Sequence, residues 1–266
     1  MAKRAAIVMF YDKVGIVDDY FTAYLEGIRP YVDHLVVVVN GTITQGYEAK
    51  LHPADEVLYR KNIGFDVAAY VHGLQHLQWG YEFDEVLMTN HTQFGPIGSF
   101  ETVFTWAKWS DYDFWGMSAH PGGYGVPDQP KHFYVPYHIQ SHWMAIKTRI
   151  LTNTVIGYLV NVAQYTNNYD ASVLYFEHRF AEFLMENGFT VGAMFTPEIG
   201  VGSATLDNAE YFLRQGMPIL KRRLFFNNPP FIRIGSAKCD KVFNYAESTG
   251  YNTELIKQSI SRALNS

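Results

Sequence analysis

Short apolar runs alternate with amphipathic stretches along the first third of the chain. Four segments are predicted as strands: Ala6–Tyr11, His34–Val39, Glu56–Tyr59 and Glu85–Met88. Two segments between them are predicted as helices: Val17–Val32 and Asp66–Gln78. This alternation is typical of a mainly parallel sheet flanked by helices. The sequence therefore predicts an α/β, Rossmann-like fold, whose ligands gather beyond the carboxyl ends of the strands.

In the second half of the chain, the sequence pattern predicts fewer strands and more helices. Two further strands are expected at Asp113–Met117 and Trp143–Ile146. Three helices are expected: Leu174–Asn187, Asn208–Gln215 and Glu254–Leu264. A chain of 266 residues is long enough for one sizeable domain with an appended segment. We therefore expect one domain over residues 1–202 and a C-terminal helical extension, residues 203–266, packed on it.

The amino-acid composition limits the kinds of molecule that the protein is expected to bind. The net charge is −5 and no long basic run occurs, which argues against a nucleic-acid partner. A single cysteine and the lack of an apolar stretch of about 18 residues suggest a cytoplasmic protein. Lys221-Arg222-Arg223 precedes Leu224-Phe225-Phe226, which fits either peripheral contact with the inner face of a membrane or a solvated helix end. The 19 Tyr and 19 Phe residues either fill the core or line a sugar-binding cleft.

The first candidate site lies between a predicted strand and helix, in the run from Arg60 to Asp66. Gly64 allows close backbone approach, and the following helix offers free N–H groups and the positive end of its dipole. Asp66 is either a helix cap or, with Asn62, a hydrogen-bonding partner of a nucleotide base or ribose.

A second candidate site follows the strand Glu85–Met88. Asn90, His91 and Thr92 are successive polar residues at the carboxyl end of that strand, before a Gly-Pro turn. Burying three unpaired polar side chains would cost several kcal/mol, so core packing explains them poorly. A ligand site is the favoured interpretation, and a capping turn is the alternative.

Two further groups of residues lie in the second half. His138, Gln140 and His142 alternate, so an extended chain would place them on one side. They indicate either a binding surface or a half-exposed polar strand. Glu177 falls near the apolar face of the predicted helix Leu174–Asn187, where a carboxylate needs a partner or a cleft. It is a candidate general base, and a solvated helical glutamate is the alternative.

Taken together, these segments resemble the rhamnan synthesis protein F family of bacterial polysaccharide glycosyltransferases. The matching stretches occur in order: Asn62–Tyr70, Leu87–Pro96, Asp113–Gly116, His138–Ser141 and Pro218–Lys221. The resemblance implies a GT-A fold with a donor site in residues 1–100 and an acceptor and catalytic part in residues 101–202.

The resemblance also implies a nucleoside-diphosphate sugar as donor, either dTDP-L-rhamnose or a UDP-sugar. The acceptor it implies is a growing cell-surface glycan, free or lipid-linked. The donor-site residues carried over are Tyr11, Asn40, Lys61, Asn62, Gly64, Asp66, Asn90, His91, Thr92 and Lys221. His138, Gln140 and His142 are the acceptor-side candidates.

The metal-binding motif departs from the family pattern. The family has Asn-Asp-Ser where this chain has Asn90-His91-Thr92. A hard Mg²⁺ ion gains less from an imidazole than from a carboxylate, so a metal held by His91 would be Mn²⁺ rather than Mg²⁺. Without a metal, Lys61, Lys221 or Arg222 would supply the positive charge for the leaving group.

Because a rhamnose donor is β-linked and rhamnans are α-linked, the resemblance implies an inverting displacement, which needs one base. Glu177 is the expected base, and Asp66 and Asp113 are the next candidates for this role. Two other classes stay open: a non-catalytic carbohydrate-binding scaffold, and a sugar nucleotidyltransferase. The latter usually has a Gly-rich basic loop after its first strand, and Tyr11-Asp12-Lys13-Val14-Gly15 is a poor version of it.

Overall fold

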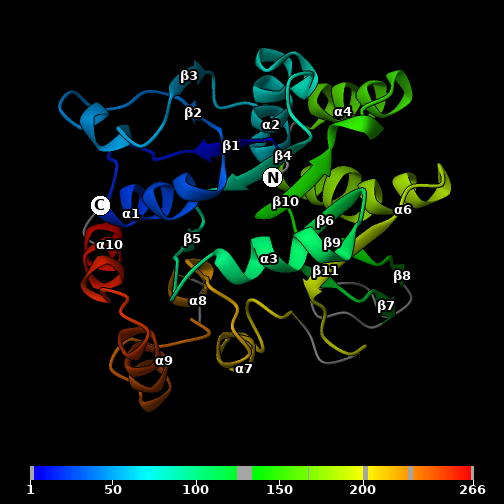
Figure 1. The fold of residues 1–266 in the computed structure, drawn as a ribbon. Coiled ribbons are helices and arrows are strands. Elements are labelled where there is room, and N and C mark those ends of the chain that lie inside the picture. Colours follow the sequence, from blue (N-terminus) through cyan, green and yellow to red (C-terminus); the bar gives the residue numbers. More distant parts are fainter. Residues whose placement is uncertain (1–2, 125–133, 167, 200–202, 227–229, 265–266) are drawn as a thin grey trace.

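A twisted, mostly parallel sheet forms the centre of the molecule. The computed structural model describes residues 3–124, 134–166, 168–199, 203–226 and 230–264. In spatial order the sheet contains β11 (Val191–Phe195), β6 (Phe114–His120), β10 (Trp143–Lys147), β4 (Glu85–Asn90), β1 (Arg4–Phe10), β2 (His34–Asn40) and β3 (Glu56–Arg60) (Figure 1). Only β10 runs antiparallel to its neighbours in this order, and β9 (His138–Ile139) pairs antiparallel with β6. The predicted mainly parallel α/β fold is confirmed.

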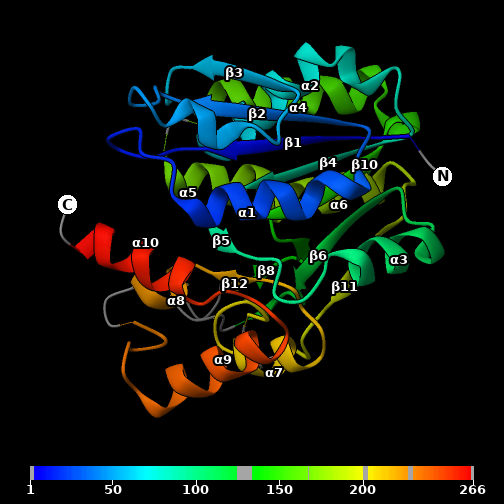
Figure 2. The ribbon, with the colours of Figure 1, turned by 60° about the vertical axis from the view of Figure 1, so that its left-hand side comes forward.

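Helices cover both faces of the sheet. One face carries α1 (Asp19–Ile28), α3 (Glu101–Ser110) and the C-terminal helices α7 (Ala209–Arg214), α8 (Arg223–Phe226), α9 (Ala237–Ser248) and α10 (Glu254–Leu264) (Figure 2). The other face carries α2 (Phe65–His76), α4 (Asn153–Tyr165) and α6 (Arg179–Glu186). The predicted C-terminal helical segment is therefore confirmed.

Shorter elements connect these layers. Two-residue strands form two small antiparallel pairs: β5 (Gln93–Phe94) with β12 (Leu220–Lys221), and β7 (Gly123–Tyr124) with β8 (Tyr134–Val135). Before α6 come the short helix α5 (Tyr169–Ser172) and a π-helical turn, Val173–His178. Single 3₁₀ turns occur at Arg29–Tyr31, Glu48–Leu51, Gln78–Gly80 and Thr148–Ile150.

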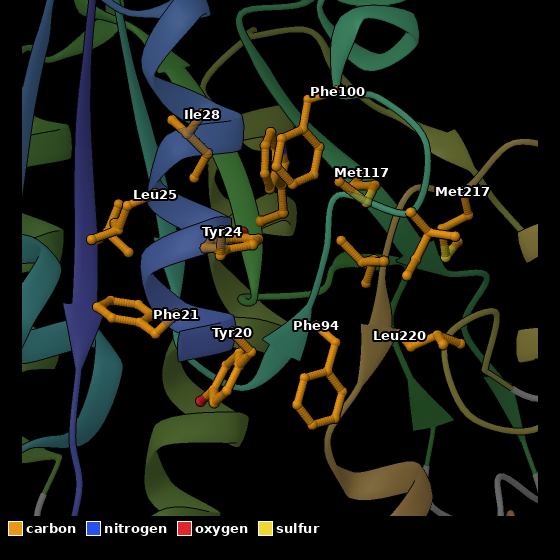
Figure 3. Close-up of a cluster of buried hydrophobic side chains, with 14 of the residues drawn as sticks. Tyr20, Phe21, Tyr24, Leu25, Ile28, Phe94, Phe100, Met117, Met217 and Leu220 are labelled. Atoms are coloured by element: carbon orange, nitrogen blue, oxygen red, sulfur yellow. The ribbon is translucent and has the colours of Figure 1, made fainter. Parts of the chain in front are cut away.

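The alternation of side chains along β1 explains the two cores. Ala6, Val8 and Phe10 face α1, whereas Ala5, Ile7 and Met9 face α2, and all six are buried. A strand with both faces covered needs a continuous apolar run, which is the pattern from which β1 was predicted. On the α1 side the core is rich in aromatic rings, with Tyr20 packed against Phe94 and Tyr24 against Phe100 (Figure 3).

The C-terminal helices are held against the sheet by ion pairs as well as by apolar packing. The Arg262 guanidinium on α10 lies 2.7 Å from Asp18 Oδ1 and 2.7 Å from Asp12 Oδ2. Ser259 Oγ donates to Asp18 Oδ2 at 2.9 Å. Because Asp12 and Asp18 border the carboxyl end of β1, α10 is positioned at the same edge of the sheet as the candidate site.

The apolar residues that follow the basic cluster pack into the interior and do not form an exposed apolar face. Leu224 and Phe225 are buried, and the Arg222 guanidinium donates to Tyr20 Oη at 2.7 Å. This arrangement gives no support to the peripheral membrane contact considered for the segment. Throughout the described ranges, no helix combines the length and the apolar character needed to cross a bilayer.

Candidate functional site

A cavity of about 310 Å³ opens at the carboxyl end of β4 and the start of α2. The position is the switch point of the sheet, because β1 pairs with β2 on one side and with β4 on the other. Its charged and polar lining includes Asp66, Asn90, Thr92, Glu177, Lys221 and Arg223. Ligands of open α/β sheets bind at such positions, so this cavity is the candidate active site.

Asp66 reaches the cavity because the backbone turns sharply before α2. Gly64 and Phe65 both adopt left-handed conformations, with φ of 77° and 51°. Gly64 is the N-cap of the helix, and the Asp66 carboxylate accepts a hydrogen bond from Asn90 Nδ2 at 2.6 Å. Asp66 is therefore not the helix cap. Burial raises the pKa of the Asp66 carboxyl to about 6, although Lys221 and Asn90 act in the opposite direction.

Asn90 and Thr92 connect Asp66 to a lysine from the C-terminal segment. Thr92 donates to Asn90 Oδ1 from its N–H (3.1 Å) and from its hydroxyl (2.6 Å). The pairing of β5 with β12 brings in Lys221, whose Nζ donates to Thr92 Oγ1 at 2.8 Å. Burial lowers the pKa of Lys221 to about 8, while Glu177 and Asp66 favour its charged form. The cavity thus holds a continuous chain of polar groups that ends in a cation.

Glu177 lies on the π-helical turn and lines the same cavity. Its Oε2 accepts from the N–H of Ser141 (3.1 Å) and from the Ser141 hydroxyl (2.6 Å). Its Oε1 lies 3.8 Å from His138 Nε2, and the side chain is 20% exposed. π-Helical turns often occur at functional sites, and this one directs the Glu177 carboxylate inward. Glu177 is therefore not a fully solvated glutamate, which was the alternative.

His138 is the centre of a row of imidazole rings beside Glu177. Its ring stacks on His120 with centroids 5.1 Å apart and lies 4.5 Å from the His178 ring. Its Nδ1 lies 2.9 Å from the Pro136 carbonyl oxygen, which leaves Nε2 toward Glu177. Burial lowers the pKa of His138 and His178. His178 lies on the π-helical turn and is buried beside His138.

The predicted strand Trp143–Ile146 corresponds to β10, but the expectation that an extended chain places His138, Gln140 and His142 on one side is wrong. A turn at Ser141 and His142 separates β9 from β10. As a result, Gln140 and His142 line the cavity, whereas His138 contacts Glu177 from behind it. Gln140 Oε1 accepts from the Ser118 hydroxyl at 2.7 Å, and the His142 carbonyl accepts from Thr89 Oγ1 at 2.7 Å.

Several predicted donor-site residues lie outside the cavity lining. Asn40 is buried and joins the end of β2 to the start of α2, accepting from Arg60 at 2.7 Å and donating to the Phe65 carbonyl at 3.3 Å. Tyr11 packs against the core on the α2 face, and Lys61 and Asn62 are exposed. A Cβ on Gly64 would lie 2.6 Å from Ala68 Cβ, so this glycine serves close packing within the protein.

His91 does not join Asn90 and Thr92 in the cavity. Its ring packs edge-on against Phe10, with centroids 5.6 Å apart. Burial and the nearby Arg222 and Lys221 lower the pKa of His91 to about 3, so it is uncharged at neutral pH. The described part of the chain contains no group of three or more His, Cys, Asp or Glu residues placed to hold a metal ion. The donor set around the cavity, with its lysine, does not fit the predicted His91–Mn²⁺ site.

Asp113 lies at the opposite end of the sheet, at the start of β6. Its Oδ1 accepts from Arg149 at 2.7 Å, and its Oδ2 accepts from the N–H and hydroxyl of Thr190, both at 3.0 Å. Although burial alone would raise the pKa of Asp113, these partners hold it below its ordinary value. The position argues against a catalytic role and for a structural one.

We therefore expect Asp113→Ala to lower stability without affecting ligand binding. Charge-assisted hydrogen bonds contribute about 1.5–3 kcal/mol, so the free energy of unfolding should fall by about that amount. Urea denaturation monitored by circular dichroism measures the change. A loss of nucleotide affinity in the folded variant would contradict this assignment.

Ser141 and Arg223 are among the cavity residues that were not predicted as site residues. Ser141 holds Glu177 with two hydrogen bonds, and Arg223 lines the cavity from the start of α8. The basic cluster at 221–223 was a visible signal for Arg223. No local signal distinguished Ser141, because its role depends on a contact with residue 177.

Comparison with known proteins gives one strong result and two weak ones. No curated protein sequence matches the chain significantly. The structure is similar to that of a 4-diphosphocytidyl-2C-methyl-D-erythritol synthase, with 16% sequence identity and a TM-score of 0.43 over 82% of this chain and 99% of that one. It is also similar to the inositol-1-phosphate CTP transferase from T. maritima, with 13% identity and a TM-score of 0.43 over 82% of this chain and 97% of that one. These two similarities are too weak to support a functional inference.

The strong result concerns the protein family. The sequence model of rhamnan synthesis protein F matches residues 35–266. This range is most of the chain and contains every charged and polar cavity residue described above. The family resemblance proposed from the sequence motifs is therefore confirmed, and the chain belongs to the rhamnan synthesis protein F family.

Proposed function

We propose that this protein is an inverting glycosyltransferase that moves a sugar, L-rhamnose, from a nucleoside-diphosphate donor to a glycan acceptor. Membership of the rhamnan synthesis protein F family supports the proposal. The observation that carries it is one cavity that contains a positioned carboxylate, Glu177, and a partly buried cation, Lys221. An inverting transfer requires these two groups: a base for the acceptor and positive charge for the departing diphosphate.

In the proposed reaction, an acceptor hydroxyl oxygen attacks C1 of the donor sugar. The bond between C1 and the diphosphate oxygen breaks, and its electron pair leaves with the nucleoside diphosphate. Glu177 takes the proton of the attacking hydroxyl. Its carboxylate is already oriented by Ser141, so little reorganisation is needed when the acceptor arrives.

Lys221 and Arg223 stabilise the negative charge that develops on the diphosphate. Lys221 is held by Thr92, and its charge is favoured by the two cavity carboxylates. Fixed cations aimed at developing charge are worth more in a cavity shielded from water than in bulk solvent. In this proposal the positive charge for the leaving group comes from these two side chains, which both line the cavity.

Asp66 is the donor-side carboxylate in this proposal. It lies at the start of α2, next to Asn90, where it can accept a hydrogen bond from a sugar or ribose hydroxyl. Tyr11, Lys61 and Asn62 lie outside the cavity and stay candidates for contact with the nucleoside. The acceptor would enter from the side of Gln140 and His142.

We expect Asp66→Ala to weaken binding of the nucleoside-diphosphate sugar at least tenfold, which is about 1.4 kcal/mol. The loss arises because a buried hydrogen-bond acceptor is removed and Asn90 Nδ2 is left without its partner. Isothermal titration with dTDP-rhamnose and a UDP-sugar measures the effect. Equal affinities for wild type and a folded Asp66→Ala variant would show that Asp66 serves only to position Asn90.

The proposed function is tested with a panel of nucleotide sugars, each incubated with and without a rhamnose-terminated acceptor. The expected result is a glycosylated acceptor, detected by mass spectrometry, with one donor strongly preferred. Binding of glycan without any transfer would favour a carbohydrate-binding scaffold. Formation of a nucleotide sugar from a nucleoside triphosphate and a sugar phosphate would identify a nucleotidyltransferase.

A further inference from the structure

A second, larger hollow lies on the outer side of the helices that follow β10. It has a volume of about 760 Å³ and is formed by α4, the π-helical turn and α6. Its aromatic lining consists of Tyr158, Tyr165, Tyr175 and Phe183, and its polar lining includes Asn161 and Glu182. We call these six residues the tyrosine groove. None of them lines the candidate active site.

The rings of the tyrosine groove are positioned and accessible. Tyr158 and Phe183 stack with centroids 4.2 Å apart and an interplanar angle of 19°, and Tyr158 Oη donates to the Tyr175 carbonyl at 2.6 Å. Tyr165 is 73% exposed and Tyr175 is 51% exposed. Exposed aromatic rings that gather around one hollow are typical of a ligand-binding groove. The stacked pair and the two exposed rings together supply the apolar surface of the groove.

The polar groups of the groove indicate the chemistry of its ligand. Asn161 offers both a donor and an acceptor, and Glu182 and Glu186 offer carboxylates. Arg179, also in the lining, is paired with Glu182 at 2.5 Å. Two carboxylates against one guanidinium disfavour a nucleotide, a phosphate or another anion. A ligand with apolar ring faces and many hydroxyl groups matches both the aromatic and the polar lining.

We infer that the tyrosine groove binds a neutral oligosaccharide, and that its ligand is the glycan chain several sugars away from the reacting end. The position of the groove supports the second part, which rests on the proposed function. Tyr175 lines the groove, whereas Glu177, two residues later on the same helical turn, lines the active site. One helical segment therefore separates the two, and a glycan that passes around it contacts both.

This inference predicts that recognition of long glycans depends on exposed tyrosines remote from the donor site. The probes are a rhamnose hexasaccharide and a rhamnose disaccharide, titrated into the full chain in the presence of saturating dTDP. Tyr165→Ala and Tyr175→Ala should each weaken hexasaccharide binding at least tenfold, whereas Tyr165→Phe, which keeps the ring, should retain it. The disaccharide should bind wild type more weakly than the hexasaccharide does.

Two controls separate this inference from folding effects and from the proposed function. Tyr81→Ala removes another exposed tyrosine, 92% accessible, and should leave hexasaccharide binding unchanged. Affinity for dTDP should be the same in every variant, which confirms that each is folded. Tyrosine-dependent hexasaccharide binding without any sugar transfer would retain the groove and reject the proposed function. No hexasaccharide binding to wild type, or wild-type affinity in both alanine variants, would overturn the groove as a glycan site.

Discussion

Glu177→Gln is expected to lower the turnover of sugar transfer at least a hundredfold while leaving donor affinity unchanged. General-base catalysis contributes about 10² to 10⁴ in rate, and an amide cannot accept the proton of the acceptor hydroxyl. The substitution keeps the shape of the side chain, and the amide oxygen can still accept the hydrogen bond from the Ser141 N–H. Steady-state kinetics with the preferred donor, combined with calorimetric donor titration, separates kcat from binding.

The matched control for this prediction is Glu254→Gln, which makes the same chemical change on the exposed surface of α10. It should keep wild-type turnover. Near wild-type turnover in Glu177→Gln would show that another residue acts as the base, and Asp66 would be the next residue to substitute. A collapse of donor binding in Glu177→Gln would assign the residue a structural role instead.

Lys221→Met is expected to lower turnover about a hundredfold at pH 7. Removing one group that stabilises developing negative charge typically costs 10² to 10³ in kcat. Methionine matches the length of the lysine stem and removes only the charged end and its bond to Thr92. The measurement is kcat for wild type and variant, at saturating donor. A change confined to KM would show that Lys221 contributes only to ground-state binding of the donor.

The same lysine predicts a pH dependence with a defined direction. Because its pKa is lowered to about 8, Lys221 is charged below that pH and loses its charge as the pH rises further. Turnover of the wild type should therefore decline above about pH 8. Lys221→Arg keeps its charge throughout this range, so its profile should lack that decline. A decline of equal size in Lys221→Arg would assign it to another group.

The central sheet and half of the site could be predicted from the sequence because both depend on local pattern. The apolar runs of β1, β2 and β4 are short and uninterrupted, and amphipathic helices are predicted between them. This alternation of strands and helices favours a parallel sheet flanked by helices. Parallel strands bring their carboxyl ends to one edge, which is why Asp66 and Asn90 were expected together and are hydrogen-bonded. Elements such as α4 were not predicted, because its Val-, Ile- and Tyr-rich sequence has the composition of a strand.

The errors within the site have identifiable physical causes. Asn90, His91 and Thr92 were treated as one group, although successive side chains of an extended chain point to opposite sides. That alternation places Asn90 and Thr92 in the cavity and leaves His91 against Phe10. The predicted helix Leu174–Asn187 begins in a π-helical turn, Val173–His178, which no regular helical spacing in the sequence indicates.

Lys221 depends on long-range structure that no local pattern describes. It reaches Thr92 through the pairing of two-residue strands, β5 and β12, that are far apart in the sequence. Its assignment to the donor site came from the family resemblance rather than from periodicity. Ser141 depends in the same way on its contact with Glu177.

The most direct test of the proposed transfer is ³¹P NMR of the phosphate product. The protein is incubated with dTDP-rhamnose and a rhamnose-terminated acceptor, and separately with dTTP and rhamnose 1-phosphate. We expect acceptor-dependent release of dTDP in the first reaction, strongly reduced in Glu177→Gln, and no product in the second. Release of pyrophosphate in the second reaction, with no acceptor-dependent dTDP in the first, would contradict the proposed transfer.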